Sequence, residues 1–203
     1  MSTPYLETGR AGQKRRTRDA LVAAARELVA AGLAPTVDEA ALTAGVARST
    51  AYRYFPGQSE LLAVAHPETV RESLLPAEPP RDPAERLDAV VVEFISLILD
   101  TEAQQRTMLR LSLEPRSPGA ERLPLRQGRA IAWLTEALQP LAQTLPEGGV
   151  RRLVLAIRSA IGIEALVWLT DVGGLTRKDA ADSMRWSAMA LLEQALAVGP
   201  PRS

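Results

Sequence analysis

Residues 36–62 limit the folds open to this chain more than any other stretch, because they have the pattern of two short helices around a tight turn. Thr36 and Glu39 have the Thr-x-x-Glu spacing of a capping box, which predicts that a helix begins directly after Thr36. Gly45 follows where the chain must reverse, a position that favours a left-handed backbone. A second short helix is expected over residues 48–54. Two such helices joined by a glycine turn form a helix-turn-helix.

The second of these helices carries groups that suit nucleic acid. Its expected outer face offers a guanidinium, short hydroxyls and phenolic hydroxyls, from Arg48, Ser49, Thr50, Tyr52, Arg53 and Tyr54. Such groups contact phosphates and base edges in the major groove of DNA. The pattern therefore predicts a recognition helix.

The surrounding motifs resemble a known family. An amphipathic helix is followed by Thr-Val-x-x-x-Ala, then Ala-Gly-Val, Tyr-Arg-Tyr-Phe-Pro and Glu-Leu-Leu, within TVDEAALTAGVARSTAYRYFPGQSELL. Over residues 15–62 the chain resembles the N-terminal domain of the TetR family of transcriptional regulators. The resemblance implies an N-terminal helix-turn-helix domain and a C-terminal helical domain that binds ligands and dimerises.

The same resemblance assigns roles to individual side chains. The Thr36 hydroxyl and nearby backbone N–H groups would contact a phosphate, and Arg48 is the best candidate for bidentate reading of guanine. Tyr54 and Phe55 could instead belong to the core, a role that we favour for Phe55 and leave open for Tyr54. The residues expected at the groove or the DNA backbone are Thr36, Arg48, Ser49, Thr50, Tyr52 and Tyr54.

Three positions depart from the family pattern. Ala47 stands where a capping serine is usual, and Tyr54 stands where histidine is frequent. Gln58 stands where a phosphate-binding lysine is common, so we expect lower affinity for DNA and a weaker dependence on salt.

Charge is distributed unevenly although the 24 Lys/Arg and 24 Asp/Glu residues balance. The first 66 residues carry eight basic and six acidic residues, and the remainder carries 16 and 18. Most of the basic excess lies between residues 10 and 18, which would attract phosphate. Lys14 and Arg15 are expected to contact DNA, although a merely solvated basic tail is the alternative.

Composition excludes several classes of protein. The chain has no cysteine and one histidine, His66, and no partner for a metal site or an acid/base pair is recognisable by spacing. We therefore expect no metal, no cofactor and no enzyme activity. Because no apolar run of about 18 residues is free of charge and no signal peptide is recognisable, we expect a cytoplasmic protein without a membrane partner.

Helical periodicity extends along the rest of the chain and predicts an all-α fold. Pro67 should kink or break the fourth helix, and residues 76–81 form a proline-rich linker. A loop is expected where prolines and Gly119 cluster between residues 115 and 124. The helices are expected at residues 13–31, 37–44, 48–54, 58–75, 82–101, 102–113, 125–142, 146–171 and 176–198.

These segments group into three parts: a flexible basic arm (1–12), a DNA-binding domain (13–66) and a ligand-binding and dimerisation domain (67–203). The helix over 146–171 is apolar over most of its circumference, so it needs cover on more than one side. We expect the last two helices to pair with their copies as a four-helix bundle in a C2 homodimer.

The C-terminal domain contains candidates for a ligand site. Glu164 is the only charge between Arg158 and Asp171, so it should pair with an arginine, lie at the dimer interface or face a cationic ligand. Because members of the family bind small molecules in this domain, an apolar pocket is assigned to Phe94, Met108, Trp133 and Trp168, for which plain core packing is the alternative.

The predicted function is a sequence-specific regulator that binds a pseudo-palindromic operator in double-stranded DNA as a homodimer. A small apolar or cationic effector would release this repressor. The alternative is a DNA-binding regulator with a filled C-terminal core that a protein partner, or no ligand, controls.

Overall fold

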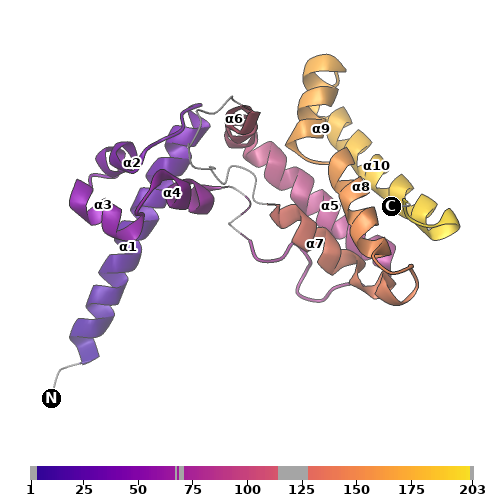
Figure 1. Cartoon of the computed structure of the whole chain (residues 1–203), viewed down its shortest axis with the longest axis horizontal. Coiled ribbons are helices and arrows are strands. Elements are labelled where there is room, and N and C mark those ends of the chain that lie inside the picture. The colour runs from indigo at the N-terminus through magenta and orange to yellow at the C-terminus, as the bar shows by residue number, and fades with distance from the viewer. Residues whose placement is uncertain (1–3, 67, 69–70, 114–127, 202–203) are drawn as a thin grey trace. The chain divides into compact units, whose positions relative to one another are not determined.

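The structure is a computed structural model that describes residues 4–66, 68, 71–113 and 128–201, with side chains from residue 12 onward. Every regular element in these ranges is helical, which confirms the predicted all-α fold (Figure 1). The chain divides into two compact units: residues 1–69 with 107–127, and residues 70–106 with 128–203. The loop expected over 115–124 lies outside the described residues.

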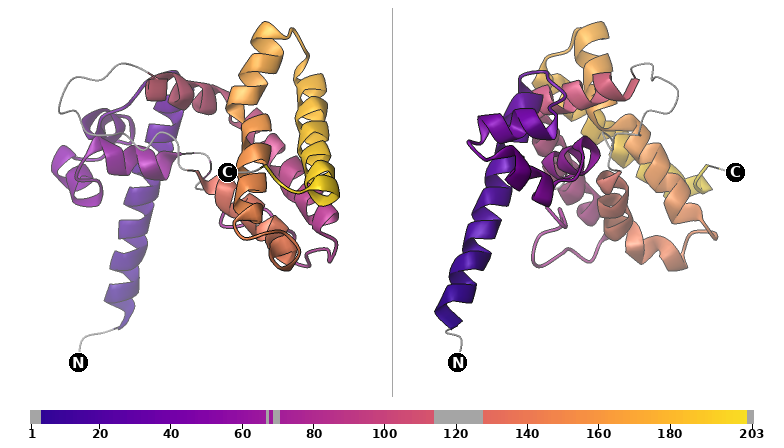
Figure 2. Two further views of the ribbon diagram at one scale, coloured as in Figure 1. Left: turned by 45° about the vertical axis from the view of Figure 1, so that its right-hand side comes forward. Right: turned by 60° about the vertical axis from the view of Figure 1, so that its left-hand side comes forward.

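The first unit is built on the long helix α1 (Pro4–Ala30). This helix begins at Pro4, whereas the sequence predicted a start at Gln13 and a flexible arm over residues 1–12. Proline is favoured in the first turn of a helix, and extending an existing helix costs less than nucleating one. Gly9 and Gly12 lie within the helix and do not interrupt it. Figures 1 and 2 show its N-terminal half extending beyond the helices packed on its C-terminal half.

Helices α2 (Val37–Thr43) and α3 (Arg48–Tyr54) form the predicted helix-turn-helix. Gly45 between them has a φ of +64°, as the turn requires. Both helices pack on α1 through small and apolar side chains that form one core, namely Leu21, Val22, Ala25, Val37, Ala40, Ala41, Ala51, Phe55, Leu61 and Ala65.

Helix α4 (Gln58–Ala65) is shorter than predicted. The sequence predicted that this helix would continue to about Leu75. His66 ends it with φ −58° and ψ 133°, the extended conformation that a residue before proline favours. The Arg26 guanidinium of α1 donates to the carbonyl oxygens of Val64 and Ala65 at 3.3 Å each, which fixes the end of α4 to α1. Partial burial lowers the pKa of Arg26.

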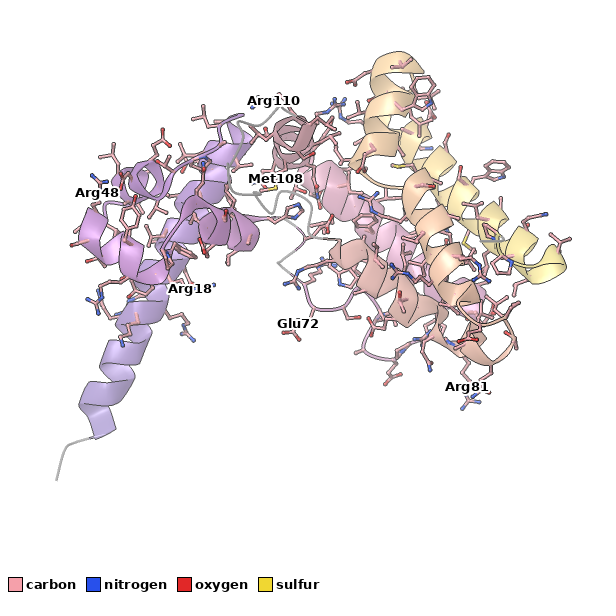
Figure 3. All side chains as sticks on the ribbon, in the orientation of Figure 1. Arg18, Arg48, Glu72, Arg81, Met108 and Arg110 are labelled. Carbon is pink, nitrogen blue, oxygen red and sulfur yellow. The ribbon has the colours of Figure 1, made fainter. Side chains whose placement is uncertain are left out.

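Helix α6 (Glu102–Leu113) is divided between the units after Arg106. In the first unit, Met108 is buried in a small core with Val29 and Leu62. Arg110 also donates to the Gly32 carbonyl oxygen at 2.8 Å, which caps the end of α1 (Figure 3). The C-terminal half of α6 is thus part of the first unit, although the sequence assigned it to the C-terminal domain.

The second unit is a bundle in which α5 and α8 each pack beside both α7 and α10 (Figure 2). Asp82 caps α5 and Thr176 caps α10 through side-chain hydrogen bonds. The elements of this unit are α5 (Pro83–Asp100), α7 (Arg129–Leu138), η2 (Gln139–Gln143), α8 (Gly149–Ala160), α9 (Ile163–Val167), η3 (Trp168–Val172) and α10 (Arg177–Val198).

The prediction of a single helix over 146–171 is wrong, because the structure has two α-helices, α8 and α9, and the π-helix η3 in its place. The break lies at Gly162, whose φ of +124° is open to glycine and strained for other residues. A Cβ atom at Gly162 would lie 2.3 Å from Nη1 of Arg158. The glycine therefore both turns the chain and leaves room for a guanidinium.

Candidate nucleic-acid interface

The outer face of α3 is open to solvent and carries the predicted recognition residues. Arg48, Ser49, Tyr52 and Arg53 are exposed, and Thr50 is half-buried. On the opposite side, Ala51 is fully buried in the core of the first unit. The exposed side chains on one side of α3 and the buried Ala51 on the other show which side of the helix is available to a ligand.

Arg48 begins α3 and is held by two neighbours. Its Nε lies 2.9 Å from Oδ1 of Asp38 on α2, and its guanidinium carbon lies 5.7 Å from the ring centroid of Tyr52, one turn along α3. The Arg48 side chain remains 74% exposed (Figure 3). Sequence reasoning singled out Arg48 but missed Asp38, because nothing in the spacing shows that α2 and α3 bring the two together.

The capping box that begins α2 is formed as predicted. Thr36 Oγ1 accepts from the Glu39 backbone N–H at 3.2 Å, and Glu39 Oε2 accepts from the backbone N–H of Thr36 at 2.7 Å and from its hydroxyl at 2.8 Å. The backbone hydrogen bond first, and then the hydroxyl, lower the pKa of Glu39. Thr36 is exposed at the predicted phosphate position, with its hydroxyl proton directed to Glu39.

The departures at Ala47 and Gln58 have visible structural consequences. Ala47 is the N-cap of α3 and supplies no side-chain hydrogen bond to it. Gln58 Nε2 instead donates to the carbonyl oxygens of Ala34 and Pro35, at 2.9 and 3.2 Å. The side chain at the family's usual lysine position therefore fastens the loop before α2 onto α4.

The two aromatic residues at the end of α3 face the interior of the unit. Phe55 is 2% exposed, and Tyr54 is half-buried against the same core. The guanidinium carbon of Arg18 lies 5.6 Å from the ring centroid of Phe55, a cation–π contact between α1 and the end of α3. Lys14 and Arg15 lie on the exposed surface of α1 one turn earlier.

The predicted ligand residues are divided between the two units. Phe94 and Trp133 are both buried there and meet edge to face, with ring centroids 5.9 Å apart. The Trp133 indole N–H donates to the Glu72 carbonyl oxygen at 2.9 Å. Met108 belongs to the core of the first unit, and Trp168 on η3 is 62% exposed.

Glu164 pairs with an arginine of its own unit. Its Oε2 lies 3.1 Å from Nη1 of Arg158, which also donates to the Ile161 carbonyl oxygen at 2.7 Å. The Arg158 guanidinium carbon lies 5.7 Å from the ring centroid of Phe94. The structure thus shows one of the arrangements that the sequence left open for Glu164, a pair with an arginine of the same domain.

A charge network joins three elements of the second unit and was not foreseen from the sequence. Arg106 on α6 meets Asp171 on η3 at 2.6 Å and Glu102 at 2.7 Å, and Glu102 also accepts from Arg177 on α10. Burial opposes ionisation of Glu102, but hydrogen bonds from Arg177 and Arg106 lower its pKa overall. Hydrogen bonds from Arg106 and Thr170 lower the pKa of Asp171 to about 2.

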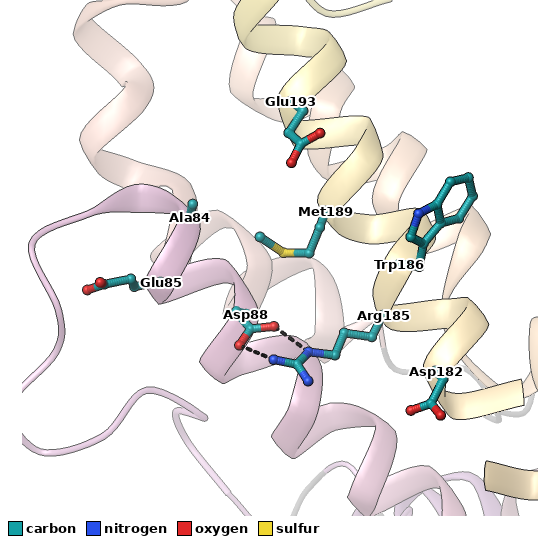
Figure 4. Close-up of a pocket in the computed structure, with 8 residues that line it drawn as sticks. All are labelled: Ala84, Glu85, Asp88, Asp182, Arg185, Trp186, Met189 and Glu193. Atoms are coloured by element: carbon teal, nitrogen blue, oxygen red, sulfur yellow. Dashed lines mark hydrogen bonds and ion pairs between the residues drawn. The ribbon is translucent and has the colours of Figure 1, made fainter. Parts of the chain in front are cut away.

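Two open hollows lie on the second unit. One, of about 570 Å³ between α5 and α10, is lined by Ala84, Glu85, Asp88, Asp182, Arg185, Trp186, Met189 and Glu193 (Figure 4). Arg185 and Asp88 form a bidentate ion pair at its floor, at 2.6 and 2.7 Å. The other, of about 480 Å³, lies between α5 and residues 71–76. Within the described part of the chain, no cluster of three or more acidic or histidine side chains could hold a metal ion.

An N-terminal helix-turn-helix whose second helix is exposed and carries arginine is typical of the helix-turn-helix class of DNA-binding proteins. Residues 20–65 match the family described as "Bacterial regulatory proteins, tetR family". Residues 20–65 thus form an N-terminal DNA-binding domain of the TetR type, the domain of a regulator of transcription.

Solved structures agree with this assignment at the level of the fold. A TetR transcriptional regulator from Rhodococcus sp. RHA1 is 21% identical, with a TM-score of 0.55 over 89% of this chain and 98% of that one. Full-length native TylP, a TetR regulator from Streptomyces fradiae, is 22% identical, with a TM-score of 0.59 over 89% of this chain and 87% of that one. A comparison with curated proteins gave no match.

Proposed function

We propose that the chain is a cytoplasmic repressor that binds a pseudo-palindromic operator as a C2 homodimer and leaves it when a small effector binds. The observation that carries the DNA-binding part is the exposed face of α3, where the Arg48 side chain is 74% exposed and its closest contact with Asp38 is made by Nε. A guanidinium presented in this way suits bidentate contact with guanine O6 and N7.

The other proposed DNA contacts follow from exposure. Ser49 and Thr50 lie beside Arg48 at the start of α3, where the recognition helix of a helix-turn-helix meets base edges. Tyr52 is exposed and would bind a backbone phosphate through its hydroxyl. Thr36 is exposed too and would contact a phosphate through the nearby backbone N–H groups, since its hydroxyl proton is donated to Glu39. Tyr54, Lys14 and Arg15 complete the proposed set. Tyr54 can contribute only its hydroxyl edge, since its ring packs on the core.

Dimerisation is supported by apolar surface on the last helices. The most apolar window within Gly149–Val172 has only 39% of its residues buried within the single chain. That segment is apolar and long enough to span a membrane by composition, but it is broken at Gly162. The exposed apolar side chains on and beside α8 and α10 are Leu155, Trp168, Val172, Leu175, Trp186, Leu196 and Val198. Large apolar surface of this kind is typical of subunit interfaces.

The proposed effector site lies in the second unit. Phe94, Trp133 and the Arg158–Glu164 pair lie together in the second unit and would receive an apolar or cationic molecule. Met108 packs in the core of the first unit and Trp168 is exposed on η3, so neither is part of this proposed effector site. The edge-to-face contact of Phe94 with Trp133 also favours the second candidate, a regulator with a filled core that a protein partner, or no ligand, controls.

A selection of bound fragments from a random DNA pool tests the function. Wild-type protein should enrich a palindromic sequence, and Arg48→Ala should bind that duplex at least tenfold more weakly, since a bidentate contact contributes about 1–3 kcal/mol of discrimination. Arg81→Ala, which removes an exposed arginine of the second unit, is the charge-matched control. Unchanged binding by Arg48→Ala would exclude the recognition role of α3.

A further inference from the structure

The ion pair of Asp38 with Arg48 joins the two helices of the helix-turn-helix on its exposed side. Asp38 lies in the first turn of α2, and Arg48 is the first residue of α3. The two side chains are 40% and 74% exposed, and exposed pairs of this kind contribute little to stability. Since α2 and α3 already share an apolar core, the pair is not needed to hold them together.

The geometry of the pair leaves the recognition end of the arginine unused. Asp38 Oδ1 meets Nε of Arg48 and makes no directed hydrogen bond, so the contact is an ion pair at the inner edge of the guanidinium. Bidentate reading of guanine uses two N–H groups on one edge, and the closest approach of Asp38 is to Nε, at the opposite end of the guanidinium from the edge that the two terminal nitrogens share. The Tyr52 ring on the next turn further restricts the plane of the guanidinium.

The charge of Asp38 affects the two kinds of DNA contact differently. A free guanidinium binds any phosphate, which adds affinity without sequence preference. A carboxylate 2.9 Å away offsets that positive charge and repels phosphates. It does not prevent N–H donation to uncharged base acceptors such as guanine O6 and N7.

We infer that Asp38 is a specificity-determining residue for DNA recognition, because it orients Arg48 toward a base edge and keeps it from phosphates. This inference rests on the proposed function, in which α3 enters the major groove. It assigns to α2 a part in sequence discrimination that needs no direct contact between Asp38 and DNA.

The test compares wild type with Asp38→Asn on two DNA probes. One is the duplex selected by wild type from the random pool, and the other is a scrambled duplex of the same length and composition, each titrated at several salt concentrations. Asp38→Asn should bind the scrambled duplex more tightly, with a salt slope steeper by about 1.8, the value for one added phosphate contact in each subunit of the dimer. The ratio of selected to scrambled affinity should fall about tenfold, within the range for one base contact.

Two controls separate this effect from general repulsion. Glu60→Gln removes another exposed acid from a first helical turn of the same unit and should leave the affinity ratio unchanged. In an Arg48→Ala background, Asp38→Asn should no longer change the ratio, because its target is absent. If Asp38→Asn does not fold, judged by its thermal unfolding, Asp38→Ser takes its place.

The outcomes distinguish this inference from the proposed function. If Arg48→Ala binds both duplexes like wild type, the proposed function fails and this inference fails with it. If Arg48→Ala loses discrimination but Asp38→Asn keeps the wild-type ratio, only this inference is overturned. If Asp38→Asn raises the affinity for both duplexes equally, with or without Arg48, this inference is also overturned. Asp38 would then only repel DNA in general.

Discussion

Gln58 Nε2 on α4 lies 2.9 Å from the carbonyl oxygen of Ala34, in the loop that leads to α2. The same nitrogen donates to the Pro35 carbonyl oxygen at 3.2 Å. This position commonly holds a phosphate-binding lysine in the family that the chain resembles. Here the Gln58 side chain supports the loop that leads to Thr36 through hydrogen bonds within the protein.

Gln58→Lys should restore a phosphate contact. We expect tighter binding to the selected duplex at low salt and a plot of log affinity against log salt that is steeper by about 1.8, because each subunit of the dimer adds one phosphate contact. Gln58→Met, which has a similar length and no charge, should lose the loop hydrogen bonds without changing the slope. An unchanged slope in Gln58→Lys would show that this position does not reach the DNA backbone.

Gly162→Ala should destabilise the second unit. The residue has a φ of +124°, and a Cβ atom would meet Arg158 Nη1 at 2.3 Å, so both backbone strain and the loss of the Arg158–Glu164 pair are expected. Strain of this kind costs about 1–3 kcal/mol. Denaturant unfolding measures it. Gly12→Ala in α1, where a Cβ atom would make an ordinary 3.6 Å contact, is the control and should be neutral or stabilising.

The Asp171 carboxylate should make stability depend on pH in acid. Its pKa is about 2 in the folded chain against an ordinary value of 3.8, so its contribution is present above pH 3.8 and is lost as the pH falls toward 2. In Asp171→Asn the midpoint of thermal unfolding should change less with pH over that window. The pH dependence that comes from other groups should remain. A wild-type profile in the variant would show that the Arg106 pair does not hold Asp171 ionised in solution.

Leu155→Glu should convert the proposed dimer into monomers. Leu155 is 43% exposed on α8, where a charge would be buried without a partner if two copies pack together there. Sedimentation velocity gives the mass directly. Val92→Glu is the control, because Val92 is 42% exposed on α5, where it lines the hollow beside residues 71–76 and is not part of the two helices assigned to the interface. A dimer that persists in Leu155→Glu would place the interface elsewhere.

The elements of the first unit were predictable because their signals are local. The capping box of Thr36 with Glu39, the glycine turn at Gly45 and the apolar stripe of α1 each depend on residues a few positions apart. The helix boundaries that were wrong have local causes too. Pro67 ended α4 where a longer helix was expected, and Gly162 broke the apolar run after α8.

The sequence by itself determined the all-α fold, the helix-turn-helix and the exposed arginine at the start of α3, because helical periodicity and capping act within a few residues. Only the tertiary structure decided which side chains meet. Asp38 with Arg48, Gln58 with the Ala34 carbonyl, and Arg106 with Asp171 come from different elements. Ion pairs and hydrogen bonds depend on distances of a few ångströms, which are set only when the helices have packed.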